Sequence, residues 1–62
     1  MKYIVVYAAK NRKNAKRHVD TMFGRVRYYN SVEEARSNIP DNHRYIYQIM
    51  TAKYELVEEV SK

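Results

Sequence analysis

The pattern of apolar positions near the start of the chain predicts a β-strand over residues 2–9. This segment is rich in β-branched and aromatic residues, and apolar side chains fall on both of its alternating faces. Such a run is typical of a strand in the middle of a sheet. Polar and basic residues at 11–14 then interrupt the pattern, which indicates a surface turn.

The next segment has two interpretations. Its apolar residues recur at helical spacing and end at Gly24, a good helix cap, which predicts a helix over 14–23. Val19 and Phe23 also fit a strand alternation, which predicts one strand over 17–29 with Gly24 at a bulge. We favour the strand, because it would form a hairpin with the first strand and leave a basic loop at the tip.

A helix is expected over residues 31–39. Ser31 is a good N-cap, and Glu34 follows it at capping-box spacing. Pro40 would end the helix, because proline disfavours helical geometry in the residue before it.

Two further strands are predicted, at 44–50 and 54–57, from alternating aromatic and aliphatic residues. The elements together predict a small α+β domain of ββαββ type, with one helix on a three- to four-stranded, mostly antiparallel sheet. The alternative is βαβαββ, with the second helix at 14–23. A chain of 62 residues has room for one modest core, so residues 1–62 are expected to form a single domain.

Charge is distributed unevenly along this chain of net charge +5. Residues 1–29 contain eight Lys or Arg and one Asp, a net charge of +7. Residues 30–62 contain four Lys or Arg and six Asp or Glu, a net charge of −2. The first half is therefore expected to face an anionic partner.

Nucleic acid, either DNA or RNA, is the partner that this pattern favours. Five cations fall within the eight residues 10–17, and two arginines precede a pair of tyrosines at 25–29. Cations attract phosphates, and aromatic rings stack on bases. The predicted nucleic-acid-binding residues are Lys10, Arg12, Lys13, Lys16, Arg17, Arg25, Arg27, Tyr28 and Tyr29.

A protein partner is the alternative. The chain has seven tyrosines, and tyrosine and arginine are enriched in the energetic centres of protein interfaces. An inhibitor or adaptor module could dock onto a larger protein complex through a tyrosine-bearing sheet surface or edge. Self-association would also add burial that so small a core lacks, so a homodimer is a further alternative.

The residues that catalysis needs are scarce. The chain has no cysteine, a single glycine and two histidines that each stand beside charged residues, so we expect no catalytic residue, metal site or cofactor and a protein that is not an enzyme. The apolar run at the start is too short for a signal peptide or a membrane span. We therefore expect a cytoplasmic protein without membrane contact.

Overall fold

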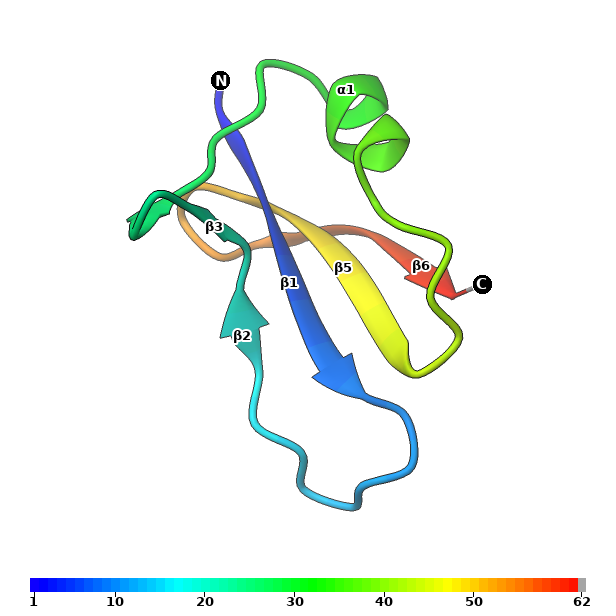
Figure 1. Cartoon of the computed structure of the whole chain (residues 1–62). Coiled ribbons are helices and arrows are strands. Elements are labelled where there is room, and N and C mark those ends of the chain that lie inside the picture. Colours follow the sequence, from blue (N-terminus) through cyan, green and yellow to red (C-terminus); the bar gives the residue numbers. More distant parts are fainter. Residues whose placement is uncertain (62) are drawn as a thin grey trace.

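The computed structural model describes residues 1–61 and shows a small α+β domain with one short helix, a four-stranded antiparallel sheet and a second sheet of two strands (Figure 1). The elements in chain order are β1 (Tyr3–Ala9), β2 (His18–Val19), β3 (Thr21–Met22), β4 (Arg25–Val26), α1 (Val32–Ser37), β5 (Tyr45–Thr51) and β6 (Leu56–Ser61). The four-stranded sheet has the order β2-β1-β5-β6. The two-stranded sheet, β3-β4, is an addition that the ββαββ prediction did not contain.

The predicted first strand is confirmed, and it lies inside the sheet. β1 pairs with β2 on one side and with β5 on the other, where Val5 lies opposite Ile49 and Tyr7 lies opposite Tyr47. Both of its faces are apolar because both are covered, one by α1 and the other by a smaller group of side chains that includes Val19.

The segment after the first loop is extended, so the alternative helix over 14–23 is wrong. The amide of Asp20 donates to the carbonyl of Val5 at 2.8 Å, and Tyr29 pairs with Tyr3 further along the same edge of β1. The free backbone groups of β1 thus bind this segment at both of its ends, and tertiary pairing overrides the helical spacing.

Between these two ends the chain leaves the edge as a hairpin. β3 and β4 form this excursion, and the amide of Arg27 donates to the carbonyl of Asp20 at 3.1 Å across its base. Gly24, with a φ of 78°, lies in the turn of this hairpin. The glycine therefore marks a chain reversal, and the predictions of a helix cap and of a strand bulge are both wrong.

The helix begins where the sequence predicts. The side chain of Ser31 accepts a hydrogen bond from the amide of Glu34 at 3.0 Å, so Ser31 is the N-cap. α1 ends at Ser37, somewhat before the predicted limit at residue 39. Within residues 1–61, no helix has the length and hydrophobicity that crossing a membrane would require.

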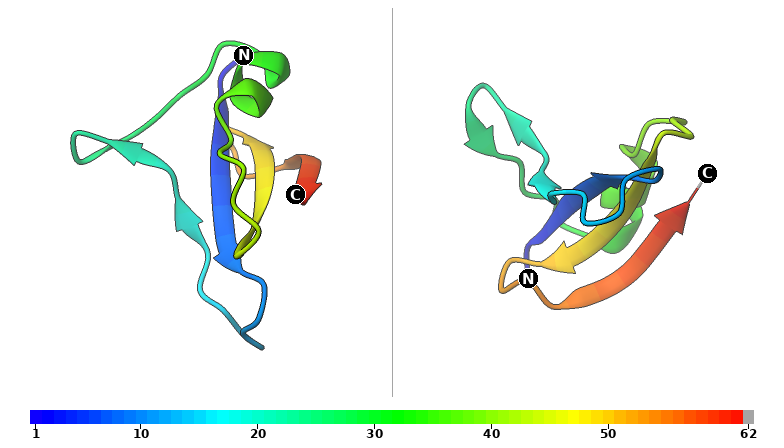
Figure 2. Two further views of the ribbon diagram at one scale, coloured as in Figure 1. Left: turned by 45° about the vertical axis from the view of Figure 1, so that its right-hand side comes forward. Right: turned by 90° about the horizontal axis from the view of Figure 1, so that it is seen from below.

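The main core lies between α1 and the sheet. Its buried residues are Val5, Tyr29, Ala35, Ile39, Tyr47 and Ile49. With only six residues, α1 covers the end of the sheet near the N-terminus and leaves the opposite end open, where the loop after β1 extends beyond the strands (Figures 1 and 2).

Candidate nucleic-acid interface

The connection between β1 and β2, residues 10–17, carries the cations and is here called the basic loop. The amide of Lys10 donates to the carbonyl of Arg44 at 2.9 Å and fixes the start of the loop, while the pairing of His18 with Tyr7 fixes its end. Asn14 has a φ of 64°, a left-handed conformation that asparagine tolerates better than most residues. The loop is therefore held at both ends and turns at Asn14.

An open cavity of about 670 Å³ lies between the basic loop and the end of the sheet. Three cationic side chains and two aromatic rings are among the groups that surround it. The lining residues are Ala9, Arg12, Lys13, Asn14, Ala15, Lys16, His18 and Tyr45. Positive charge and ring surface thus face the same hollow.

Tyr45 reaches this cavity because of the register of the sheet. β5 places Tyr45 opposite Ala9, the last residue of β1 before the basic loop. The Tyr45 ring is 5.4 Å from the ring of Tyr7 in an edge-on arrangement, and Tyr7 in turn is 5.5 Å from the ring of His18. These contacts orient the half-buried rings of Tyr7 and Tyr45 and the exposed ring of His18.

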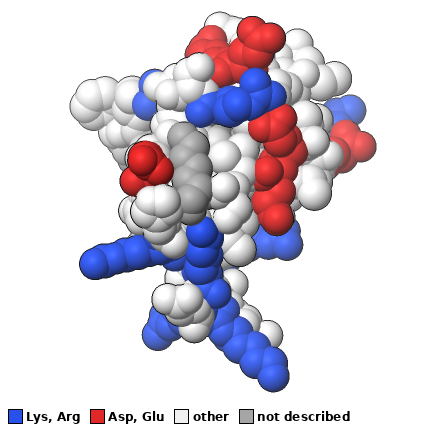
Figure 3. All heavy atoms as spheres, turned by 90° about the vertical axis from the view of Figure 1, so that its right-hand side faces the viewer, with Lys and Arg blue, Asp and Glu red and all other residues white. Residues whose placement is uncertain are grey.

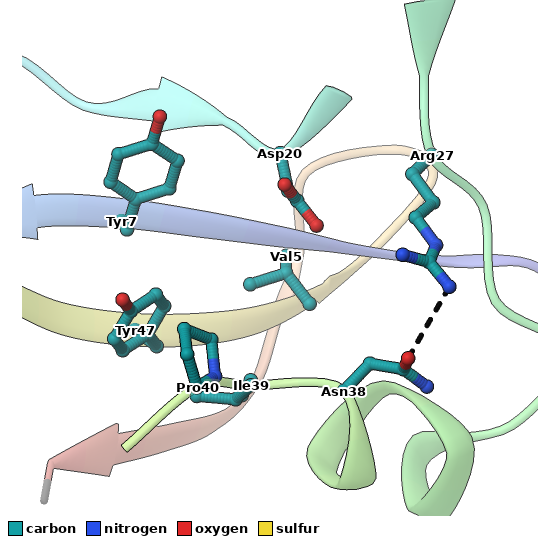
Figure 4. A pocket seen from close by; sticks show the side chains of 8 residues that line it. All are labelled: Val5, Tyr7, Asp20, Arg27, Asn38, Ile39, Pro40 and Tyr47. Atoms are coloured by element: carbon teal, nitrogen blue, oxygen red, sulfur yellow. Dashed lines mark hydrogen bonds between the residues drawn. The ribbon is translucent and has the colours of Figure 1, made fainter. Parts of the chain in front are cut away.

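A groove of about 350 Å³ continues from these rings along the sheet (Figure 4). Tyr7 and Tyr47 line the end nearer the basic loop, and Arg27 donates to Asn38 at 3.3 Å at the other end. The ring of Tyr47 is 6.0 Å from Tyr7 and 6.3 Å from Tyr45, so the groove and the loop cavity share one row of tyrosines. We call Tyr7, Tyr45 and Tyr47 the tyrosine row.

Three cations of the basic loop, Arg12, Lys13 and Lys16, are in no ion pair within the part of the chain that the structure describes. The ion pairs found there, Arg36–Glu58 and His43–Asp41, do not include Arg12, Lys13 or Lys16. In Figure 3 several Lys and Arg side chains extend from the lower end of the molecule, and the acidic side chains lie over the upper half of the visible face together with other Lys and Arg side chains. On this face the cations at the lower end are therefore not accompanied by acidic side chains, whereas the upper half is of mixed charge.

The acidic residues of the second half are in part engaged with the protein itself. Arg36 donates to both carboxylate oxygens of Glu58, at 2.7 and 2.8 Å. Hydrogen bonding from this guanidinium lowers the pKa of the Glu58 carboxyl below its usual value. Gln48 also donates to Glu59 at 3.1 Å.

The structure brings some of the predicted site residues together and separates others. Arg12, Lys13 and Lys16 share the loop cavity. Arg17 instead lines a smaller hollow of about 180 Å³ with residues of the sheet face that α1 does not cover. Arg25 lies on the β3-β4 hairpin.

Two predicted residues of the 25–29 segment have structural roles. Tyr29 is 1% exposed and its hydroxyl donates to Asp20 at 3.2 Å, so its ring is inaccessible to a base and its assignment to the interface is wrong. Burial raises the pKa of the Tyr29 phenol. Arg27 is half-buried, with its guanidinium 5.0 Å above the Tyr29 ring. Tyr29 pairs with Tyr3, and this pairing places the Tyr29 ring in the core beneath α1. Its neighbour Tyr28 is 54% exposed.

The rings at the basic loop were not among the predicted site residues. Tyr7 and Tyr45 alternate along strands in the way that core residues do, and His18 stands among charged residues. Tyr45 could have been assigned to the site from an antiparallel pairing of the two predicted strands. Such a pairing places the start of the 44–50 strand beside the end of the first strand, at the base of the loop.

Outside this interface, His43 and Asp41 approach each other at 3.9 Å on the surface. Residues 1–61 contain no group of three or more His, Asp or Glu side chains that could hold a metal ion. No protein-family model, no curated protein and no solved structure matches the chain.

Proposed function

We propose that this protein is a nucleic-acid-binding accessory protein that contacts phosphates with the basic loop and bases with the rings beside it. The convergence of Arg12, Lys13 and Lys16 with Tyr45 and His18 around one open cavity is the observation that supports this function. In this proposal the protein acts in the cytoplasm, by binding rather than by catalysis, alone or within a nucleoprotein complex.

The chemistry of the cavity suits a single strand better than a duplex. Lysine and arginine side chains bind phosphates and release counterions, and this attraction is independent of base sequence. Aromatic rings stack on unpaired bases, a contact worth about 1–3 kcal/mol per base. A duplex would have to open before its bases could reach Tyr45, so we expect a single-stranded oligonucleotide to bind more tightly.

Fluorescence anisotropy with a labelled single-stranded oligonucleotide tests the proposal. The loop variant K13E/K16E is compared with K2E/K53E, which changes the net charge equally but at the other end of β1, where Lys2 accepts from Ala52 through its carbonyl. We expect the loop variant to lose most of its affinity and the control variant to lose much less. Equal affinity of the two variants, or no binding by the native protein at low salt, would refute the proposal.

A protein-binding module is the second candidate, and the edge of the sheet supports it. β6 lies at the end of the strand order, and Leu56 and Val57 at its start are exposed together with Tyr54, which precedes them. An inhibitor or adaptor could add a partner's strand or apolar surface at this edge, and a homodimer could form there. L56E should then abolish self-association or binding to a protein partner and leave oligonucleotide affinity unchanged.

A further inference from the structure

The β3-β4 hairpin stands away from the rest of the protein (Figure 2), and Phe23 lies in its turn. Phe23 is 95% exposed, and Met22 and Val26 beside it are also exposed. A methyl group built on Gly24, the next residue, would find no atom within 4 Å. The ring at this tip therefore contributes little to the packing of the fold.

The backbone of the turn makes the choice of phenylalanine unusual. Phe23 has a φ of 53° and Gly24 a φ of 78°. A two-residue hairpin turn with positive φ at both positions favours Asn, Asp or Gly, and a bulky residue adopts this conformation at a cost. Neither burial nor turn geometry explains Phe23, so a role in contact with a partner is the remaining physical reason.

The charge around the tip indicates what that partner is. Residues 21–28 contain no acidic residue, and of their two arginines Arg27 donates to Asn38, which leaves Arg25 as the cation of the tip. Arg25 is exposed and pairs with Met22, and these two residues flank the turn formed by Phe23 and Gly24. An apolar ring beside a cation suits a nucleic acid as partner. The ring can lie between two stacked bases, and the cation can bind a neighbouring phosphate. Apolar side chains act as wedges between base steps in this way.

The hairpin and the basic loop also belong to one continuous stretch of the chain, with the loop at the end of β1 and the base of the hairpin near its start. The chain passes from the loop through β2, along the edge of β1, into the hairpin. We propose that Phe23 inserts between neighbouring bases of the nucleic acid held by the basic loop, with Arg25 on an adjacent phosphate. This inference rests on the proposed function.

The absence of tryptophan from the chain permits a direct test. F23W introduces a single tryptophan at the hairpin tip, and stacking between bases quenches its fluorescence. The matched control is Y54W, because Tyr54 is also exposed (61%) and has a φ of 64°, but lies in the turn before β6. Both variants are titrated with a mixed-sequence oligonucleotide, once as a single strand and once as a duplex.

We expect quenching of F23W but not of Y54W, and an affinity of F23A that is about 5- to 100-fold weaker than that of the native protein. The melting temperature of F23A should equal or exceed that of the native protein, because the ring of Phe23 is exposed and its loss removes little packing. If K13E/K16E abolishes binding while F23W stays unquenched and F23A binds like the native protein, the wedge is refuted and the proposed function stands; the tip is then a protein contact. If the native protein binds neither oligonucleotide, both inferences fail.

Discussion

The two ends of one sheet face differ in how far their tyrosines are exposed, and Tyr47, 5% exposed, lies between the buried Tyr29 and the open cavity. At the end covered by α1, Tyr29 is 1% exposed and belongs to the main core. At the end beside the basic loop, Tyr7 and Tyr45 are half-buried and Tyr45 lines an open cavity. The residue type is the same, so the exposure of each ring depends on how much of α1 and the segment after it packs over that part of the sheet.

The polar groups at the two ends also differ in how far they are engaged with other groups of the protein. At the covered end they bind one another, as Tyr29 does with Asp20 and Arg27 with Asn38. At the loop end, within residues 1–61, neither Lys13 nor Lys16 is in an ion pair. The covered end thus has polar groups that bind one another, whereas Lys13 and Lys16 at the loop end are available for the ligand that we propose.

The largest expected effect is a loss of stability when a side chain of the main core is truncated. Ile49 is fully buried opposite Val5, and truncating such a side chain to alanine costs about 2–5 kcal/mol. A domain of this length has a total stability of only about 3–9 kcal/mol, so I49A should be largely unfolded or melt far below the native protein. Thermal denaturation followed by circular dichroism measures this. An unchanged melting temperature would mean that Ile49 does not belong to the core.

The next effect concerns the open end. Y45A should weaken binding of a single-stranded oligonucleotide by about 1–3 kcal/mol, because one stacking ring is lost. Y45F keeps the ring and should bind like the native protein. Anisotropy titrations at a temperature where both variants are folded measure this, and Y54A, far along the chain from the loop, is the control. Equal loss in Y45A and Y54A would contradict a role for the tyrosine row.

The salt dependence of binding sharpens the comparison further. K13Q/K16Q removes two cations from the loop cavity, and each lost phosphate contact should reduce the slope of log K against log salt by about 0.7. K2Q/K53Q removes two cations elsewhere and should leave the slope nearly unchanged. Titrations at several salt concentrations measure both slopes. Equal slopes would show that net charge, and not the loop, attracts the ligand.

The smallest effect lies at the acidic end. Arg36 lowers the pKa of Glu58, so the ion pair stabilises the folded state at pH values above the ordinary pKa of a glutamate. This contribution is lost as the pH falls through the lowered pKa. NMR titration should show the Glu58 midpoint rising in R36A, whereas the change in stability at neutral pH should be slight, because the pair lies at the surface with both side chains partly exposed. An unchanged midpoint would contradict the pairing.

Elements with local signals could be predicted from the sequence. The first strand follows from its run of β-branched and aromatic residues, and the start of α1 follows from Ser31 and Glu34. The cations of the basic loop were equally visible as a cluster, because they are neighbours in the chain.

Features that depend on contacts between distant segments could not be predicted. Tyr29 is buried because it pairs with Tyr3, 26 residues earlier in the sequence, and Tyr45 reaches the basic loop because it pairs with Ala9. The hairpin at 21–26 combines a strand alternation with a turn whose glycine also suited a helix cap. Single-residue patterns do not contain these pairings.

Amide chemical shifts of the isotope-labelled protein, recorded during titration with a single-stranded oligonucleotide, test the central claim most directly. We predict the largest shifts in residues 10–18 and at Tyr45, with smaller changes along the tyrosine row and almost none in α1 or β6. Shifts that are largest in α1 or β6, or no shifts at saturating oligonucleotide, would contradict a nucleic-acid interface at the open end of the sheet.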